Sequence, residues 1–404
     1  MIEANTEAFI ALLLVSAAIA VLSRRLPVPF VVVLAVVGCL AGAVVGQGRV
    51  TLTPSLILFI LLPGLLFEAA FRLEWERLKA GLVPILALAT VGVVVTTAVV
   101  ALLGYLVLGL GIGVAVVFGA VVAPTDPVAV VAVFRQLGMP AQLVTIVEAE
   151  SLVNDGTAVV LFTVALSAAT GDAASVPSVL LDLVRLIGGG IAIGAAIGIG
   201  LSWTVARVDD PQVEITITAM CAYGTYLIAD KAHTSAILAV VVAAVILGNY
   251  GRRHGMSRRT MEAVDSVWDY ITFVLNSATF LLLGFAVPWQ GLTARIGAIG
   301  AAFAILIAAR AVAVYGVLGV LRPFGRHVTL TWQHLLVWSG LRGAVAVALL
   351  LSLVDKGGEY DTVRALAYGV VLLSILIQGT TIAPLSRRLV PSLPSRESES
   401  SGAV

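Results

Sequence analysis

Four carboxylates interrupt two strongly apolar stretches of the chain. They are Asp126, in AVVAPTDPVAVVAVF (120–134), and Glu148, Glu150 and Asp155, in VEAESLVNDGTAVVLF (147–162). A carboxylate that faces lipid at the centre of a bilayer costs about 2.5–3.5 kcal/mol. These side chains must therefore face the protein interior and have partners there. Buried ionisable groups of this kind are candidates for an ion or proton path.

The spacing of polar residues in the second stretch predicts an ion-binding face. Ser151 and Asp155 are four residues apart and share one face of a helix, as Glu150 and Asn154 share the neighbouring one. One turn thus offers a hydroxyl and a carboxylate together. Oxygen ligands suit a hard cation such as Na⁺.

Composition places this constellation in a membrane. Of 404 residues, 60% are hydrophobic and only 12% are charged, with a mean hydropathy of +1.08, whereas soluble domains carry about 25% charged residues. The balance of 24 basic and 23 acidic residues argues against a nucleic-acid partner. Cys39 and Cys221 both lie in apolar segments, where a thiol is a packing residue. No cofactor is predicted.

Apolar windows near the spanning length of about 20 residues predict an all-α, polytopic membrane protein. The thirteen expected helices are 5–23, 28–46, 53–71, 82–109, 112–134, 141–169, 178–206, 212–230, 234–250, 265–287, 293–321, 330–354 and 362–386. With the N-terminus outside, 16 Lys or Arg residues fall on the cytoplasmic side and six on the other. This bias predicts an external N-terminus and a cytoplasmic C-terminus.

Two of these helices contain residues that interrupt a helix. Pro124 and Pro127 flank Thr125 and Asp126 in helix five, and each proline removes a backbone donor. In helix twelve, two glycines bracket Leu341 and Arg342 in the sequence GLRG (340–343). We therefore expect two discontinuous crossing helices at matching positions of an inverted six-helix repeat, the place where secondary transporters bind substrate.

Arg310 and Arg342 are the cations expected inside the membrane. We expect Arg310 to pair with Glu150 and Arg342 with Asp126, although such pairs can also be purely structural. Asp155 then has no fixed cationic partner and can bind either a proton or a cation. If the unoccupied carboxylate cannot cross, this competition produces antiport.

Two further carboxylates have less certain roles. Glu68, just before Arg72, either pairs locally or lines the ion path, and Glu148 is expected near the membrane entrance. Two other functional classes are alternatives. An intramembrane aspartyl protease would carry Tyr-Asp and Gly-x-Gly-Asp motifs, which are absent around Asp126 and Asp155. A cation channel would need a continuous pore, commonly on a symmetry axis.

Three segments resemble signature sequences of the cation/proton antiporter family, in its NhaP-type and eukaryotic sodium/proton exchanger branch. They are APTDPVAVVAVF (123–134), EAESLVNDGTAVVLF (148–162) and GLRGAVAVAL (340–349). The resemblance extends over nearly the whole chain. It implies a homodimer of thirteen-helix protomers that work by an elevator-type movement of a core domain.

The resemblance also implies roles for individual residues. Asp155 would be the carboxylate that binds cation and proton, with Na⁺ held by Asp155, Ser151 and Thr125. Asp126 would contribute to the site, and Glu68 would lie near it. Asn154 would go with electroneutral exchange of one proton per cation, and the two carboxylate–arginine pairs would be stabilising.

The expected domain organisation follows the same resemblance. Residues 1–80 and 171–290 would form the dimerisation domain together with a linker helix, and residues 81–170 and 291–390 the core transport domain. Residues 391–404 would be a short disordered cytoplasmic tail. The expected function is Na⁺/H⁺ antiport in the plasma (inner) membrane, with Li⁺ as a second cation and K⁺/H⁺ antiport as the alternative. Membrane lipid is the surrounding partner.

Overall fold

A computed structural model describes residues 2–23, 28–45, 53–171, 176–287, 292, 294–324 and 328–390. Within these residues all regular secondary structure is helical, and eight helices are long and apolar enough to cross a membrane. The prediction of an all-α, multi-pass membrane protein is confirmed, whereas the thirteen spans stay a prediction. The tail expected at 391–404 lies outside the described residues.

The first part of the chain forms a series of helices, several of them widened by π-helical turns (η). In order, these are α1 (Ile2–Ser23), α2 (Phe30–Val45), α3 (Pro54–Leu56), η1 (Ile57–Leu61), α4 (Leu62–Phe71), α5 (Trp75–Ala87), η2 (Leu88–Gly92), α6 (Val93–Leu108), α7 (Ile112–Val122), α8 (Val128–Gln136) and α9 (Ala141–Ala169).

The second part continues in the same way. Its elements are α10 (Val176–Val205), α11 (Pro211–Ala219), η3 (Met220–Gly224), α12 (Thr225–Lys231), α13 (Ala236–Ile246), η4 (Leu247–Gly251), α14 (Arg252–His254), α15 (Arg258–Phe285), α17 (Ile296–Leu321), the 3₁₀ turn η5 (Arg322–Phe324), α18 (Leu330–Trp338), α19 (Ala344–Leu351), the 3₁₀ turn η6 (Val354–Lys356), α20 (Glu359–Leu373), the π-helical turn η7 (Ser374–Gln378) and α21 (Gly379–Leu389).

Local sequence signals set several helix ends. The Asp210 side chain accepts from the N–H groups of the first turn of α11, and Pro211 occupies the position where no N–H is needed. Thr329 caps α18 in the same manner through the N–H of Trp332. At the other kind of end, Gly109 terminates α6 with a left-handed φ of 68°.

The helix is interrupted at both positions that the prolines and glycines predicted. Residues 123–127 separate α7 from α8, and residues 339–343 separate α18 from α19. Because Pro127 has no N–H, the carbonyl of Ala123 loses its helical partner, which explains the first interruption. That the two interrupted helices cross within an inverted repeat stays a prediction.

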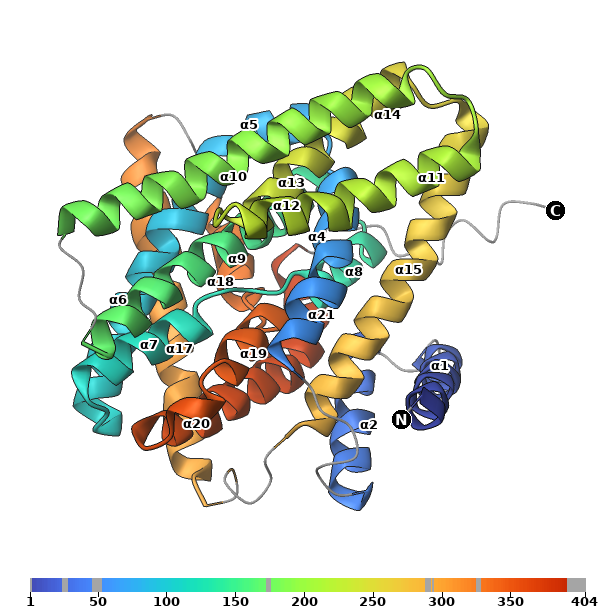
Figure 1. Ribbon diagram of the computed structural model, residues 1–404. Coiled ribbons are helices and arrows are strands. Elements are labelled where there is room, and N and C mark those ends of the chain that lie inside the picture. The colour runs from blue at the N-terminus through green and yellow to red at the C-terminus, as the bar shows by residue number, and fades with distance from the viewer. Residues whose placement is uncertain are drawn as a thin grey trace.

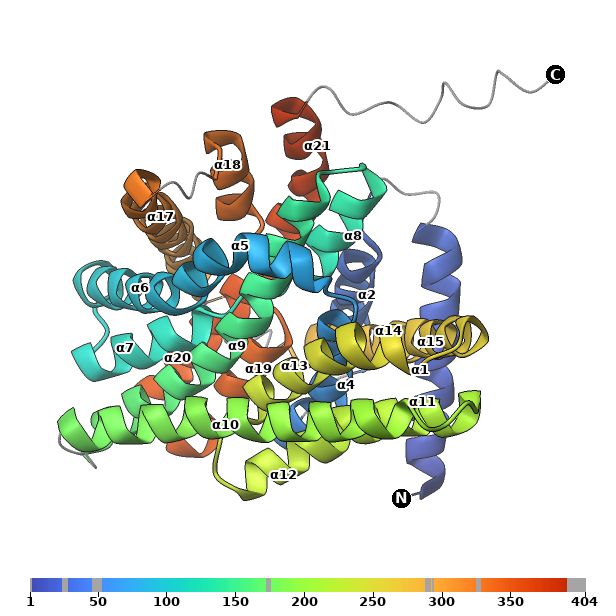
Figure 2. The same ribbon diagram turned by 90° about the horizontal axis from the view of Figure 1, so that it is seen from above.

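The interrupted helices meet at the centre of the bundle. There α9 packs against α5, α7, α8 and α13, and α19 packs against both α7 and α9 (Figures 1 and 2). Other helices, such as α1 and α10, lie at the periphery in the view from above (Figure 2). Segments more than 200 residues apart in the chain are thus neighbours: Asp126 N–H donates to the Leu341 carbonyl at 2.8 Å.

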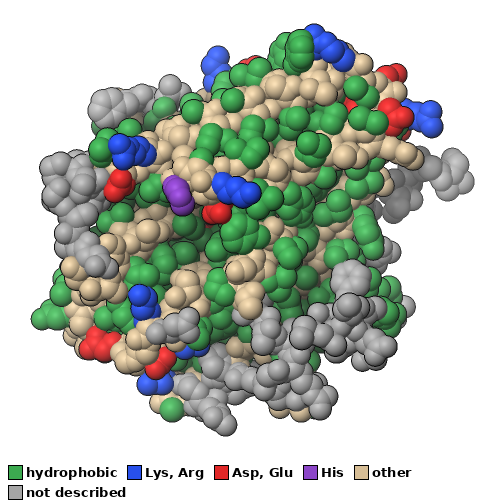
Figure 3. All heavy atoms as spheres, viewed as in Figure 1, with side chains coloured by type: hydrophobic (Ala, Val, Ile, Leu, Met, Phe, Trp, Pro, Cys, Tyr) green, Lys and Arg blue, Asp and Glu red, His purple; other side chains and the backbone are tan. Residues whose placement is uncertain are grey.

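The outer surface suits contact with lipid. Hydrophobic side chains cover much of the face shown in Figure 3, and most of its charged side chains lie towards the margins. Large apolar side chains that are more than half exposed include Leu14, Leu106, Val184 and Val320. Such exposure is expected where the surrounding medium is hydrocarbon instead of water.

Candidate ion-binding site

The first interruption is fastened to α9 by a small network of polar side chains. The Thr125 and Ser151 hydroxyls share a hydrogen bond of 2.9 Å. Asn154 donates from Nδ2 to Thr125 Oγ1 at 2.7 Å, and its Oδ1 accepts from the Thr125 backbone N–H at 3.3 Å. Asn154 therefore fixes both the backbone and the side chain of Thr125.

Glu150 and Arg310 form the ion pair that the sequence predicted. Arg310 donates from both terminal nitrogens to the two Glu150 carboxylate oxygens, at 2.9 and 2.8 Å. The exposed fractions of the two side chains are only 4% for Arg310 and 1% for Glu150. Asn154 Nδ2 adds a bond of 3.0 Å to Glu150 Oε1, so the Glu150 carboxylate is well satisfied.

The expected pair between Asp126 and Arg342 is absent, and this prediction was wrong. Arg342 donates from Nη1 to the carbonyls of Ala123 and Pro124, the second at 2.9 Å. The physical reason is that the interruption leaves these buried carbonyls without helical N–H partners. A guanidinium group satisfies both at once, and it also places positive charge at the C-terminal end of α7.

Asp126 instead lies against backbone N–H groups. Its carboxylate accepts from the Val128 N–H at 3.0 Å, and the N–H of Ala344 also faces it. These groups begin α8 and α19, where helix N-termini offer unsatisfied donors and partial positive charge. Gly343 makes the approach possible, since a Cβ atom at this position would collide with the Asp126 carboxylate.

Asp155 is the exception among these carboxylates. It forms no hydrogen bond or ion pair with any residue that the structure describes, and it is 9% exposed. It lines a narrow cavity of about 50 Å³, whose polar lining includes Thr125 and Asp126. The cavity has room for a small ion with at most one or two water molecules.

One part of the cavity lining comes from α4 and is apolar. It consists of four side chains of α4: Leu62, Leu65, Leu66 and Ala69. Ser151 does not line this cavity and reaches it only through its bond to Thr125. Of the three predicted Na⁺ ligands, Asp155 and Thr125 are therefore in place at the cavity, and Ser151 supports Thr125.

Charge at the centre does not balance. Three carboxylates (Asp126, Glu150 and Asp155) face two guanidinium groups (Arg310 and Arg342), which leaves one excess negative charge when all are ionised. One monovalent cation, or one proton, would neutralise this excess.

Glu68 does not line the cavity, and a role near the ion path stays a prediction. It pairs with Arg72 at 2.5 Å, and Arg72 also contacts Asp269 at 2.5 Å. The next residue along the chain, Ala69, lines the cavity in its place. Of the two roles considered for Glu68, local pairing is the one that the structure contains.

Glu148 has a partner that the sequence reasoning missed. Arg135 donates from one terminal nitrogen to both Glu148 oxygens, at 3.1 and 3.0 Å. Both residues line a second cavity of about 320 Å³ beside the α4–α5 connection. The position of Arg135 directly after Phe134, the last apolar residue of α8, was the available signal.

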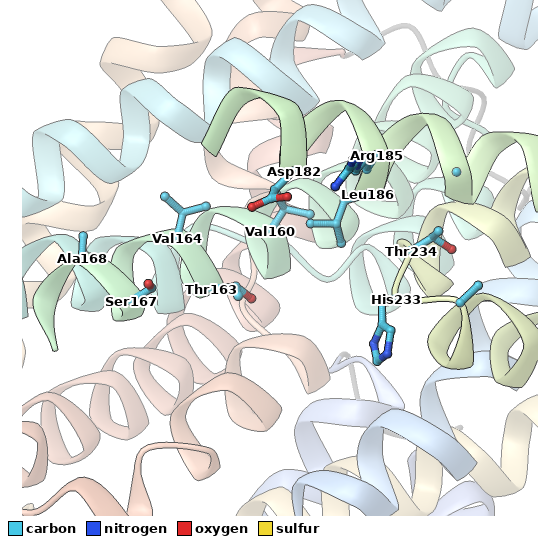
Figure 4. A pocket seen from close by; sticks show the side chains of 12 residues that line it. Val160, Thr163, Val164, Ser167, Ala168, Asp182, Arg185, Leu186, His233 and Thr234 are labelled. Carbon is cyan, nitrogen blue, oxygen red and sulfur yellow. The ribbon is translucent and has the colours of Figure 1, made fainter. Parts of the chain in front are cut away.

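A larger cavity of about 830 Å³ lies elsewhere on α9. It extends along the later turns of α9, between Thr163 and Ser167 on one side and Asp182, Arg185 and His233 on the other (Figure 4). Asp155 is not among its lining residues. The residue after Asp155, Gly156, packs closely against Leu238 of α13.

These observations define a class of protein. Two interrupted helices meet beside buried carboxylates within a multi-pass membrane protein, and secondary transporters bind their substrates at such a place. The family model described as sodium/hydrogen exchanger, transmembrane, matches residues 10–388. The chain therefore belongs to the sodium/hydrogen exchanger family.

Individual proteins agree with this assignment. The Na(+)/H(+) antiporter ApNhaP of Aphanothece halophytica is 39% identical over 396 residues, covering 96% of this chain and 75% of that protein. The Na(+)/H(+) antiporter NhaP of Pseudomonas aeruginosa is 38% identical over 353 residues, covering 84% of this chain and 82% of that protein.

A solved structure shows the same fold. The sodium proton antiporter MjNhaP1 from Methanocaldococcus jannaschii superposes with a TM-score of 0.78 at 21% identity, covering 95% of this chain and 98% of that one. The resemblance inferred from the three motifs is confirmed. The chain is a secondary transporter and not an enzyme, so the protease and channel alternatives are excluded.

Proposed function

We propose that this protein exchanges Na⁺ for H⁺ across a membrane, and that the two ions compete for Asp155. The observation that carries the proposal is the isolation of Asp155: it is the carboxylate of the central cluster that makes neither an ion pair nor a hydrogen bond with the described residues. The printed names of the relatives as Na(+)/H(+) antiporters support the choice of ions.

Coupling follows from the shape and charge of the cavity. An empty, ionised Asp155 would have to move along the four apolar side chains of α4 that face it, which is unfavourable for an unpaired charge. Binding of one Na⁺ or one H⁺ removes the excess charge. The site therefore crosses the membrane only when Na⁺ or H⁺ is bound, and exchange of the two ions is obligatory.

The same balance supports an electroneutral cycle. Asn154, beside Asp155, is a neutral amide that is committed to Thr125 and Glu150. Asp155 is then the single exchangeable carboxylate, and one proton replaces one cation. Li⁺, a small hard cation, fits the small cavity beside the Asp155 carboxylate as a second cation. K⁺/H⁺ exchange is the alternative, since K⁺ is larger but equally charged.

The movement that exposes the site follows from how the cavity is built. The ligands lie on α9 and the interrupted helices, whereas the facing wall belongs to α4. We propose that residues 81–170 and 291–390 move as a core domain, elevator fashion, against residues 1–80 and 171–290. The latter would also dimerise two protomers in the plasma membrane, with external N-termini and cytoplasmic C-termini.

Purified protein in proteoliposomes tests this function. An imposed Na⁺ gradient should drive proton flux, read by an internal pH dye, without a change in membrane potential. The Asp155→Asn variant should give no flux while remaining a folded protein of unchanged oligomeric state. Robust exchange by that variant would refute the role of Asp155, and flux with K⁺ alone would favour the alternative. Glu262→Gln, at an exposed ion pair with Arg258, is the matched control.

A further inference from the structure

The second interruption opens one particular backbone hydrogen bond. In a continuous helix the Trp338 carbonyl would accept from the Arg342 N–H, four residues later. Here the last regular bond of α18 runs from the Ser339 N–H to the Leu335 carbonyl at 2.8 Å. The Leu341 N–H then turns back to the Ser339 carbonyl at 2.8 Å. Both the Trp338 carbonyl and the Arg342 N–H therefore need other partners in a buried place.

Two side chains of η7 supply these partners. The Arg342 N–H donates to Ser374 Oγ at 3.0 Å, and Gln378 donates from Nε2 to the Trp338 carbonyl at 3.0 Å. Ser374 and Gln378 are both fully buried and stand at the two ends of the π-helical turn. Ser374 takes the place of the Trp338 carbonyl as acceptor, and Gln378 takes the place of the Arg342 N–H as donor.

The direction of the Ser374 bond is fixed. A hydroxyl has one hydrogen, and Ser374 donates its hydrogen to the Val371 carbonyl at 2.7 Å. It therefore faces Arg342 as an acceptor. The Gln378 amide is oriented for the opposite reason, because the Trp338 carbonyl accepts only from the NH₂ side of an amide. Ser374 thus supplies the acceptor for the Arg342 N–H, and Gln378 supplies the donor for the Trp338 carbonyl.

The segment held in this way forms part of the ion site. The Leu341 carbonyl accepts from the Asp126 N–H at 2.8 Å, and the Arg342 guanidinium caps the carbonyls of the first interruption. Gly343, the next residue, abuts the Asp126 carboxylate. A shift of residues 339–343 would therefore displace Asp126 and Thr125, which line the cavity beside Asp155.

We propose that Ser374 and Gln378 are positioning residues that set the cation affinity of the Asp155 cavity by holding the second interruption in register. Neither lines the cavity, so their effect passes through residues 338–342. The inference rests on the proposed Na⁺/H⁺ exchange and adds to it two residues from the last helical segment of the described chain.

The experiment compares Ser374→Ala and Gln378→Met with matched controls in Na⁺-driven proton flux. Met resembles Gln in shape but cannot donate, so packing is largely kept. We expect each variant to raise the apparent KM for Na⁺ by about tenfold, because misplacement of a binding group is costly. Vmax per folded protein should change by less than about twofold, and Ser374→Thr should restore the KM because it keeps the hydroxyl.

Two control variants separate positioning from general loss of a buried polar group. Ser386 is equally buried in α21, but within the described part of the chain its hydroxyl bonds only the Ile382 carbonyl of its own helix, at 2.7 Å. Gln333 is a buried glutamine that donates to the Val328 carbonyl at 2.8 Å, at the far end of α18. Ser386→Ala and Gln333→Met should leave the KM for Na⁺ unchanged.

A second measurement does not depend on transport. Hydrogen–deuterium exchange of the Arg342 amide should accelerate at least about tenfold in Ser374→Ala, and not in Ser386→Ala, because the amide loses its acceptor. If the wild type exchanges Na⁺ for H⁺ but both variants keep the wild-type KM, the positioning role is refuted and the proposed function stands. If the wild type shows no exchange, the proposed function fails, and the assignment of cation affinity to this pair fails with it.

Discussion

Glu150 and Asp155 lie five residues apart on α9, in the same apolar surroundings, and have opposite environments. Glu150 accepts both bonds of a bidentate arginine and a third from Asn154. Asp155 makes neither an ion pair nor a hydrogen bond with the described residues and faces a cavity. Five residues turn a helix by about 140° beyond a full turn, so the two carboxylates point to different neighbours.

This difference teaches how one helix can combine support with transport. A buried carboxylate with a fixed cation is neutralised once, at folding, and thereafter resists change. One without a fixed cation must be neutralised by something that can leave. The contrast also explains why α9 needs Asn154. Its bonds to Thr125 and Glu150 hold the face that carries Glu150 and the face beside the cavity in fixed relative positions.

The largest expected effect concerns the ion pair between Glu150 and Arg310. Glu150→Ala and Arg310→Ala should each reduce the free energy of unfolding by about 3–5 kcal/mol, because each leaves an unpaired buried charge. Unfolding in detergent micelles measures this loss. The double variant should be much less destabilised than the sum of the two. Simple additivity would show that the two residues do not act as a pair.

Another carboxylate of α9, Glu148, provides a control pair. Glu148 and Arg135 also form an ion pair, but the Arg135 side chain is 50% exposed. Their single variants should lower the free energy of unfolding by no more than about 1 kcal/mol. A loss as large as that of Glu150→Ala would mean that burial does not distinguish the two pairs.

At Asp155, the expected effect is stabilisation of the folded protein by the bound ion itself. Na⁺ that binds the folded protein at a hundred times its Kd adds about 2.7 kcal/mol to stability. Thermal unfolding of the wild type should therefore shift upward with Na⁺ at constant ionic strength, with choline as the reference cation. Asp155→Asn should remove this shift without lowering the baseline stability. A Na⁺-dependent shift that survives in Asp155→Asn would place the cation elsewhere.

Asn154→Asp should reduce the difference between the environments of Glu150 and Asp155. The substitution removes the donor to Thr125 and places a second carboxylate within about 3 Å of Glu150, at an expected cost of about 1–3 kcal/mol. It also adds a second exchangeable charge beside Asp155. We expect Na⁺-driven exchange to move net charge, measured as a current on a solid-supported membrane. An electroneutral cycle in this variant would show that residue 154 does not set the stoichiometry.

Much of the fold and of the contrast between Glu150 and Asp155 could be predicted from the sequence. Apolar windows located the helices, the prolines and glycines located both interruptions, and the scarcity of membrane arginines led to the pair between Glu150 and Arg310. Each of these features depends on side-chain type, which the sequence states directly. The choice of Asp155 as the carboxylate without a cation depended in part on the assignment of Arg342 to Asp126, which the structure does not contain, and its ion-binding role stays a prediction.

The missed features depend on the backbone. Arg342 binds two carbonyls, and Asp126 binds N–H groups at helix ends, yet neither partner appears as a letter in the sequence. Charge counting therefore joined Asp126 to Arg342 because no other charged partner was in view. The same limit hid Ser374 and Gln378, whose importance comes from the one backbone bond that the second interruption opens.

The smallest expected effect concerns Glu68, the carboxylate that the sequence placed near the ion. Its side chain is 15% exposed and pairs with Arg72, which also has Asp269 as a partner. Glu68→Gln should lower the free energy of unfolding by at most about 1 kcal/mol. It should leave the KM for Na⁺ within about twofold of the wild type, because Glu68 does not line the cavity.

Asp269→Asn is the matched control for that variant, since it removes the other carboxylate bound to Arg72. If both variants behave alike, Glu68 is one of two interchangeable partners of an arginine at the helix end. A KM that rises with Glu68→Gln alone would instead mean that Glu68 leaves Arg72 during the cycle and faces the ion. The contrast drawn on α9 would then extend to α4, with one carboxylate serving both as a support and as a ligand.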